Sequence, residues 1–492
     1  MLLALWVRLW QPDVRPPHFD EGVNGWFVDQ ITENGYYDYD PTNYHGPLHF
    51  YVLWLAQSVL GRDIAVLRLP TALVGAGCVW LVLSLGTWLG RRAVFWGGLF
   101  LALSPGAVYY ARYAIHETWM VFFLLAALRG WWLWTESGKS SGIPWMAAGL
   151  TGLLVTKETH LLHLGSFALA LPCLAWWERV VPSRGAPQPP RPAASLHRVA
   201  VPLFWCLFAL GALYSGGGLH LPDLVDFFTA FAAWAHTGVE GGEGGGHTKA
   251  WSYWLGLMAR YEWAALLGLA FAPLCMARVP RPVRLLSILG CGTLLAYSLI
   301  PYKTPWCIVS LLWPFTLLAG VALDALWRVH PAGRIAALGV GAALLMLSAS
   351  STRRVAFDRC TDEAEPYVYV QTTHALERLT DPLKELLRRD PLSRNLVGHV
   401  VIESSYPIPW LLGDYPNIGY YTKELTADSA DADFLLVGHS LKEAVEQRLK
   451  GTYFTETFLL RPALEGCTLY LAVHRFRELF PDRPSGFEPL TP

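Results

Sequence analysis

Long apolar segments recur through the first 350 residues, and short polar or basic connections separate them. A membrane-spanning helix needs about 20 mostly apolar residues, so each long segment predicts a span. The apolar stretch Gly46–Leu60 is too short for a span and fits an interfacial or re-entrant helix better. The predicted spans are Ala65–Leu89, Ala93–Tyr110, Thr118–Trp134, Ile143–Thr156, His160–Trp177, Val199–Tyr214, Trp251–Met276, Leu285–Ile300, Trp306–Trp327 and Ile335–Ser350.

The chain starts with a shorter apolar stretch, Met1–Trp10, which has only about half the length that a span requires. No small-residue cleavage site follows it, so the stretch does not fit a signal peptide. The pattern favours a first helix truncated at its start over one that crosses the membrane with distortion. With this helix included, the sequence predicts a polytopic α-helical membrane protein of about 11 spans.

Most of the basic residues before the C-terminal part fall on alternate connections between the predicted spans. Cytoplasmic loops carry an excess of Lys and Arg, so these connections are predicted to face the cytoplasm. The other connections and the C-terminal part then face outward from the cytoplasmic (inner) membrane. The basic connections are Arg91–Arg92, Lys139, Arg179–Arg198, Arg278–Arg284 and Arg328–Arg334. The outward ones are residues 11–64, 111–117, 157–158, 215–250 and 301–305.

The composition supports a membrane protein. Charged residues make up 16% of the chain and hydrophobic residues 53%, whereas a soluble domain carries about 25% charged residues. The 23 tryptophans agree with this class, because Trp is enriched at the two membrane interfaces. The net charge of −1 gives no basic surface for nucleic acid, so the lipid bilayer is the predicted environment and nucleic acid is not a predicted partner.

After Ser350 the composition becomes that of a soluble domain. We therefore divide the chain into a transmembrane domain, residues 1–350, and an extracytoplasmic domain, residues 351–492. Alternating strand and helix patterns predict a small α/β fold for the second domain. The predicted strands are Tyr367–Gln371, Val397–Glu403, Phe434–Gly438, Tyr453–Leu459 and Cys467–His474, and the predicted helices are His374–Arg389 and Leu441–Lys450.

The first outward loop carries adjacent carboxylates in the sequence HFDEG, at Asp20 and Glu21. Such a pair suits a general base or a metal ligand. The alternative is a helix cap, in which Asp20 accepts backbone N–H bonds at the start of a helix. An aromatic-rich stretch follows, and within it Tyr44 and His45 are candidate substrate contacts.

The second outward connection, YYARYAIHETW, contains Arg112, His116 and Glu117. Ionisable groups at span ends are costly and are therefore candidates for function. Glu117 could serve as a second acidic group facing Asp20. Its alternative role is an acidic residue in the first turn of the next span, which the helix dipole favours.

Two further outward ends carry lysines. TKETH contains Lys157 and Glu158, and PYKTPW contains Tyr302 and Lys303. A lysine at a span end can bind a phosphate as a point charge, or it can extend its side chain to the lipid head groups. The Gly-rich stretch GVEGGEGGGH, residues 238–247, fits either a lid over a site or a plain connection.

Taken in order, the segments HFDEG, YHGPLHFY, RLPTAL, RYAIHE, TKE and PYKTPW resemble the GT-C membrane glycosyltransferases. That superfamily includes the protein O-mannosyltransferases and the aminoarabinose lipid A transferases. The combination looks closest to the bacterial and archaeal group of flippase-associated proteins of the archaeal N-glycosylation pathway. The resemblance covers about residues 1–330 and extends weakly beyond them.

The resemblance implies a polyprenyl-phosphate-linked sugar as donor and transfer on the outer face. It makes Asp20 the catalytic carboxylate of the first loop, with Glu21 as its partner. Glu117 lies where relatives often carry Asp. Lys157 falls where relatives often have a lysine near the lipid phosphate. A divalent metal bridging Asp20 and Glu117 is compatible with this chemistry, but the sequence does not require it.

Two functions of different classes follow. The first is an inverting glycosyltransferase, in which Asp20 deprotonates a lipid, glycan or protein acceptor. Arg112, Lys157 and Lys303 would then stabilise the departing polyprenyl phosphate. The alternative is a lipid-linked glycan flippase, or a non-catalytic accessory of glycan export, which would hold the lipid phosphate without chemistry. The large outward domain and the lack of the internal repeats that many transporters show favour the transferase.

Overall fold

The computed structural model describes residues 1–184, 189–190, 195–240, 247–462 and 464–487. Most of the Gly-rich stretch 238–247 lies outside these residues, so the lid stays untested. The chain divides into two compact units. The helical unit comprises Met1–Pro12 and Gln30–Cys360, and the sheet unit comprises Asp13–Asp29 and Thr361–Pro492.

This division differs from the predicted boundary after residue 350 in two ways. The last long helix, α17 (Pro331–Arg353), continues into a π-helical turn, η4 (Arg354–Asp358), so the helical unit ends at Cys360. The segment Asp13–Asp29, which was predicted to be part of the transmembrane domain, packs with the C-terminal part instead.

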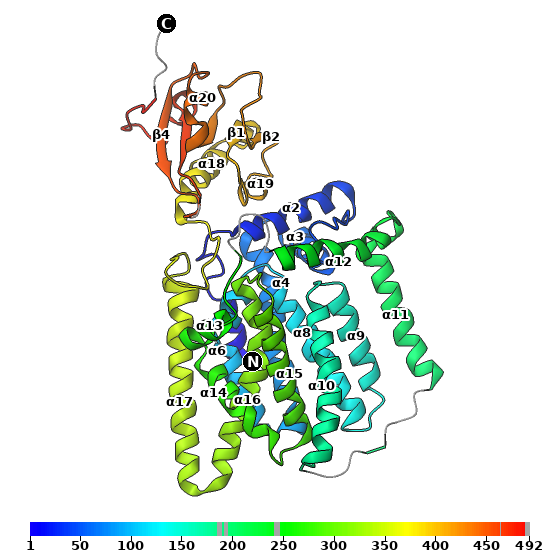
Figure 1. Cartoon of the computed structure of the whole chain (residues 1–492). Helices are drawn as coiled ribbons and strands as arrows, with labels where there is room; N and C mark the ends of the chain where they lie inside the picture. Colours follow the sequence, from blue (N-terminus) through cyan, green and yellow to red (C-terminus); the bar gives the residue numbers. More distant parts are fainter. Residues whose placement is uncertain (185–188, 191–194, 241–246, 463, 488–492) are drawn as a thin grey trace. The chain divides into compact units, whose positions relative to one another are not determined.

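The helical unit is built from apolar helices that lie side by side (Figure 1). Helix α16 is central, since it packs against α6, α14, α15 and α17. The first helices are α1 (Leu2–Leu9), α2 (Phe19–Asn34, which continues from the sheet unit), α3 (Leu48–Leu60), α4 (Ile64–Ser84), α5 (Gly86–Leu89), α6 (Arg91–Leu103), α7 (Pro105–Ala111), α8 (Glu117–Thr135) and α9 (Gly142–Leu154). They are followed by α10 (His160–Val180), α11 (Leu196–Tyr214), η1 (Gly216–Gly218), α12 (Asp223–Glu240), α13 (Tyr253–Tyr261), α14 (Trp263–Phe271), η2 (Ala272–Met276), α15 (Arg281–Leu299), η3 (Pro305–Cys307) and α16 (Ile308–Val329).

The chain is a multi-pass membrane protein. Among the described residues, 6 helices are long and apolar enough to cross a membrane, or up to 8 if each of two bent pairs counts as one span. The sequence pattern predicts about 11. Two of the apolar segments form shorter helices of 13 residues each, α3 and α9.

The two bent pairs meet at one buried carboxylate. Helices α6 and α7 are bent by 56° at Ser104, and α13 and α14 by 120° at Glu262. Glu262 accepts the Gly106 N–H at 2.6 Å and the Ser104 hydroxyl at 2.8 Å, so it occupies the N-terminus of α7. Negative charge is favourable at a helix N-terminus. Glu262 therefore ties one break to the other and fixes the direction of α7.

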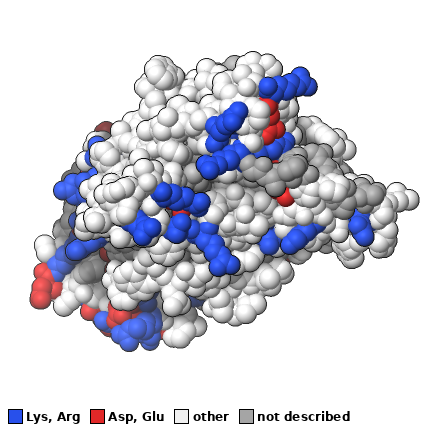
Figure 2. All heavy atoms as spheres, turned by 90° about the horizontal axis from the view of Figure 1, so that it is seen from below, with Lys and Arg blue, Asp and Glu red and all other residues white. Residues whose placement is uncertain are grey.

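One end of the helical unit collects basic side chains (Figure 2). At this end Arg92 pairs with Asp324 at 2.7 Å, which joins the start of α6 to the last turns of α16. Arg281, at the start of α15, pairs with Glu136 at 2.7 Å and with Glu178 at 3.1 Å. These contacts bring several of the predicted basic connections together, as the alternation of spans requires.

The sheet unit contains a small mixed sheet with strand order β2-β1-β3-β5-β4. Strand β1 runs parallel to β2 and β3, and β5 runs antiparallel to β3 and β4. The strands are β1 (Val397–Val401), β2 (Asn417–Tyr421), β3 (Phe434–Gly438), β4 (Tyr453–Phe458) and β5 (Cys467–Ala472). The helices are η5 (His374–Leu376), α18 (Glu377–Arg389), η6 (Pro391–Asn395), α19 (Ile408–Leu411), η7 (His439–Leu441), α20 (Lys442–Glu446) and α21 (Val473–Phe476).

Both faces of the sheet are covered. Leu436 of β3 packs in one core with Leu383 of α18, whereas Leu435 packs in a second core with Val445 of α20. Alternate residues of a strand point to opposite faces, so the apolar run of β3 serves both cores. The α/β fold predicted for this part is confirmed.

Candidate active site

The turn between α9 and α10 carries Lys157 and Glu158. The chain just before α3 lies against it, because the Gly46 N–H donates to the Thr156 carbonyl at 3.1 Å and the Leu48 N–H to the Val155 carbonyl at 3.0 Å. A Cβ on Gly46 would come within 2.3 Å of the Val155 backbone, so this approach needs glycine. Tyr44 and His45 are thereby placed beside the lysine turn.

Four ionisable side chains from three segments form two pairs here. The Lys157 ammonium contacts the Glu117 carboxylate, and the His45 Nδ1 lies 3.0 Å from Glu158 Oε2. The side chains of Glu117 and Lys157 are 2% and 7% exposed. Charges buried to this extent are stable only when they are paired. Lys157 therefore does not extend to the lipid head groups.

The pairing sets the charge states in the turn. Burial lowers the pKa of Lys157, but the charges of Glu117 and Glu158 outweigh this effect and hold the pKa well above its ordinary value. Burial raises the pKa of Glu158, yet His45 and Lys157 outweigh it and leave this pKa below its usual range. Both groups are thus charged at neutral pH.

Two more imidazoles, those of His116 and His49, cluster with His45, and their rings are tilted relative to one another. The ring of His116 lies 4.6 Å from that of His45 and 4.2 Å from that of His49. Burial holds the pKa of His116 well below its ordinary value, with the neighbouring histidines and Lys157 acting in the same direction. His116 is therefore neutral. The sequence does not single out His49, because this residue lies within an apolar helical segment.

A cavity of about 480 Å³ opens at this point. Its polar wall includes Lys157, Glu158 and His45, while Leu162 and Trp254 belong to its apolar wall. A wall of mixed character suits an amphipathic molecule with a charged head and an apolar chain. The remaining lining residues are Tyr44, Thr159, Trp234, Ala235, Tyr297, Leu299, Ile300, Pro301, Tyr302, Thr304, Trp306 and Cys307.

Arg112 and Lys303 do not line this cavity. The buried Arg112 guanidinium donates to the carbonyls of Trp10 at 2.5 Å and Gln11 at 2.6 Å, and to two more carbonyls of α1. The Lys303 ammonium donates to the carbonyls of Lys249 and Ile300. Both side chains hold backbone segments in place.

Asp20 and Glu21 belong to the sheet unit, where they begin α2. Glu21 is fully buried and accepts the His18 N–H at 3.0 Å, which is the reciprocal contact of a capping box. The helix cap, which was one of the two alternatives for Asp20, is thus made by His18 and Glu21. Asp20 lies in the first turn with its side chain 35% exposed.

His18 fixes the direction of this helix start. Its Nδ1 accepts the Asp20 N–H at 3.0 Å, so Nε2 carries the proton and donates to the Tyr369 carbonyl at 2.7 Å. Burial lowers the pKa of His18, against the pull of Asp20, which keeps the ring neutral as this pattern requires. Phe19 packs against Tyr406 and under the Arg461 guanidinium.

A divalent metal bridging Asp20 and Glu117 stays a prediction. The Glu117 carboxylate already contacts an ammonium group, which competes with a cation for its oxygens. Within the described ranges, only Asp38, His220 and Asp223 bring three or more ligand atoms close enough to share an ion.

No protein-family model matches the sequence, and no curated protein matches it significantly. Solved structures do resemble it. ArnT from Cupriavidus metallidurans bound to undecaprenyl phosphate has a TM-score of 0.64 at 13% identity, and the match covers 95% of this chain and 96% of that one. The apo form of ArnT gives a TM-score of 0.59 at 13% identity, with 95% and 96% covered.

The oligosaccharyltransferase from Archaeoglobus fulgidus, solved with Zn and sulfate, has a TM-score of 0.52 at 11% identity. That match covers 96% of this chain and 72% of the other. At such identities the similarity is one of fold. The chain has the GT-C fold of polytopic membrane glycosyltransferases, as the motifs predicted. The flippase-associated subgroup stays a prediction.

Proposed function

We propose that this chain is an inverting glycosyltransferase that moves a sugar from a polyprenyl-phosphate donor to an acceptor on the outer face of the cytoplasmic membrane. The observation that carries the proposal is the 480 Å³ cavity, which combines Lys157 with an apolar wall. A polyprenyl-phosphate sugar has the matching chemistry, with an anionic head and a long apolar chain. The related fold of ArnT, solved with undecaprenyl phosphate, supports this class of ligand.

Lys157 is the proposed phosphate ligand. Its ammonium is held charged and directed into a site with little water, where electrostatic interactions are strong. The donor phosphate would compete with Glu117 for this ammonium. Tyr44 and Tyr302 also line the cavity, and their hydroxyls and ring faces suit a sugar.

Asp20 is the proposed general base. Its carboxylate reaches solvent, whereas the neighbouring Glu21 is buried in the cap. In the proposed step Asp20 takes the proton of an acceptor hydroxyl, and the hydroxyl oxygen bonds to the anomeric carbon of the donor. The bond from that carbon to the phosphate oxygen breaks, and its electron pair leaves with the polyprenyl phosphate. A single displacement of this kind inverts the anomeric configuration.

The proposal is tested by turnover. Membranes containing the protein are supplied with a panel of labelled polyprenyl-phosphate sugars, and the release of free polyprenyl phosphate is measured. The wild-type protein should release it with at least one donor, whereas Asp20→Asn should lower the rate about 10²-fold, because Asn keeps the size but cannot act as a base.

Asp13→Asn is the matched control, since Asp13 is an exposed carboxylate of the same segment. It should turn over at the wild-type rate. A flippase or accessory would bind and move labelled donor without releasing polyprenyl phosphate. Normal turnover by Asp20→Asn would overturn the assignment of the base.

A further inference from the structure

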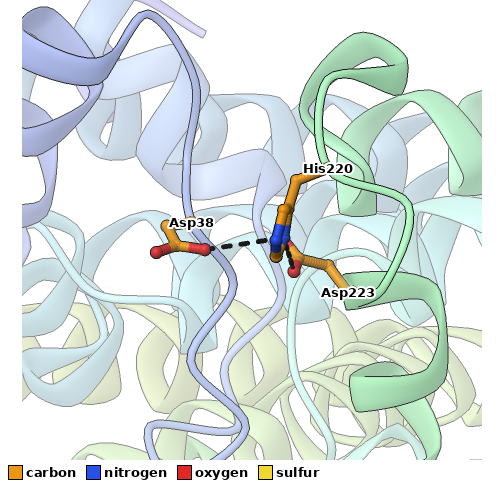
Figure 3. Close-up of side chains that lie close together, drawn as sticks. All are labelled: Asp38, His220 and Asp223. Carbon is orange, nitrogen blue, oxygen red and sulfur yellow. Dashed lines mark hydrogen bonds and ion pairs between the residues drawn. The ribbon is translucent and has the colours of Figure 1, made fainter.

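Outside the cavity, three potential metal ligands from two distant segments meet (Figure 3). The His220 Nδ1 donates to Asp223 Oδ1 and lies 3.8 Å from Asp38 Oδ1. One ligand atom from each of the three residues lies within 4.8 Å of the other two. Two ligands on one tetrahedral zinc ion are about 3.4 Å apart, given bonds of about 2.0–2.1 Å, so small movements would bring all three onto one cation.

The surrounding contacts hold two of these ligands in place. The Asp223 carboxylate is buried, and its Oδ2 accepts the Tyr39 N–H at 3.1 Å, which leaves Oδ1 directed toward His220. The His220 ring stacks on Tyr36 at 6.2 Å, and its backbone N–H donates to the Ser215 carbonyl at 3.0 Å. Ligands oriented by such outer contacts bind metals more tightly than loose ones.

The turn before His220 is shaped for this approach. Gly216, Gly217 and Gly218 all have positive φ, a conformation that glycine adopts without strain. A Cβ on Gly216 would lie 2.7 Å from the Tyr36 side chain. The glycines therefore let the turn close against the Tyr36–Tyr39 segment and present His220 to Asp38.

We propose that Asp38, His220 and Asp223 bind a divalent transition-metal cation of the zinc class. An imidazole nitrogen with two carboxylates favours zinc over magnesium or calcium, which prefer oxygen ligands alone. The cation takes the place of the proton that His220 Nδ1 shares with Asp223. Two carboxylates and a neutral imidazole then balance its charge.

The cation would join parts of the chain that are far apart in sequence. It links the Tyr36–Tyr39 segment to the first turn of α12. The same two stretches continue into the cavity wall, the first to Tyr44 and His45, the second to Trp234. The side chains of Asp38 and His220 are 64% and 41% exposed, so a water can complete the coordination.

The test measures metal binding without substrate, so its result does not depend on the proposed transferase activity. The full-length protein in detergent is stripped with a chelator and dialysed against Zn²⁺, and bound metal is counted by elemental analysis. Mg²⁺ is run in parallel. The wild-type protein should bind one more equivalent of Zn²⁺ than the Asp38→Asn/His220→Gln double variant, and should show no matching Mg²⁺ site.

Each single variant should weaken Zn²⁺ binding at least about tenfold. Zn²⁺ should also raise the unfolding temperature of the wild-type protein but not that of the double variant. Asp226→Asn, one turn further along α12, is the matched control and should bind like the wild type. Equal Zn²⁺ content and equal stabilisation in the wild type and the double variant would overturn the proposal. The three residues would then form only the ion pairs of His220 with Asp38 and Asp223.

Discussion

At the scale of single residues, the candidate site is a buried set of alternating charges. Lys157 contacts Glu117, and Glu158 contacts His45, with little solvent around either pair. Removing one partner of such a pair leaves an uncompensated buried charge and costs about 3–5 kcal/mol. A simple Lys157→Ala variant would therefore confuse loss of binding with loss of folding.

A neutral exchange of both partners avoids this difficulty. The double variant Lys157→Gln/Glu117→Gln keeps two polar groups of similar size but no charge, and its donor affinity should fall at least about tenfold. Binding of a labelled polyprenyl-phosphate sugar to detergent-purified protein gives the measurement.

Folding is checked by the unfolding temperature of the wild type and the double variant without donor. Binding, not turnover, is compared, because Glu117 is itself a catalytic candidate. Equal donor affinity in the wild type and the double variant would show that Lys157 does not hold the phosphate.

The sequence identified the charged members of this site because charge is rare at span ends. Lys157, Glu158, Glu117 and His45 each stood out in a polar connection. It did not identify His49, which lies within an apolar helix. The sequence could not predict the pairing of these groups either. Each carboxylate's partner is set by the packing of the segment before α3, of α8 and of the turn before α10.

At the scale of elements, Arg112 acts as a clamp for the short first helix. The last carbonyls of a helix lack partners within it. Arg112 donates to those of Val7 and Arg8, and to the carbonyls of Trp10 and Gln11, which follow the helix. Its guanidinium also stacks on Phe357 at 4.3 Å. The arginine that looks like a phosphate ligand in the sequence thus supports α1 in the structure.

Arg112→Ala should therefore lower stability more than donor affinity. Leaving several buried carbonyls without donors should cost about 2–4 kcal/mol of the free energy of unfolding. Arg112→Lys keeps the charge but cannot reach four carbonyls, so it should lose most of the same stability. Thermal unfolding in detergent and donor binding are measured for both variants.

The exposed Arg353, which pairs with Asp358 at 3.2 Å, provides the control, because Arg353→Ala should change stability little. A stable Arg112→Ala protein with weakened donor binding would restore the phosphate role.

Other elements show where the hydropathy pattern predicts the wrong structure. The apolar run Trp251–Met276 reads as one span, but the structure breaks it at Glu262, whose carboxylate is needed at the start of α7. Strand β2 was missed because its sequence, NIGYY, contains residues that are unfavourable in strands. The strand predicted at Tyr367–Gln371 is wrong, since that stretch is an irregular segment with no strand.

For the whole molecule, the fold class could be predicted from the sequence because few structures are stable in a bilayer. Every backbone polar group must be satisfied inside the membrane, so long apolar segments become helices. This constraint explains how the chain shares the fold of ArnT at only 13% identity. The sequence could not predict that Asp13–Asp29 belongs to the sheet unit. Its place there depends on contacts between residues far apart in the chain, such as that of His18 with Tyr369.

The orientation in the membrane remains a prediction, and it rests on the basic end of the helical unit (Figure 2). Positive connections are retained in the cytoplasm. Single cysteines at Thr42 and Thr426 should therefore react with an impermeant thiol reagent from the outside of intact cells. A cysteine at Ala332, beside Arg334 at the basic end, should react only after the cells are opened.

All three positions are exposed, so access is limited by the membrane alone. Native thiols are corrected for by labelling the unmodified protein. Labelling of Thr42→Cys and Thr426→Cys from opposite sides would contradict the predicted topology, and with it the placement of the acidic loop and the C-terminal domain on one face.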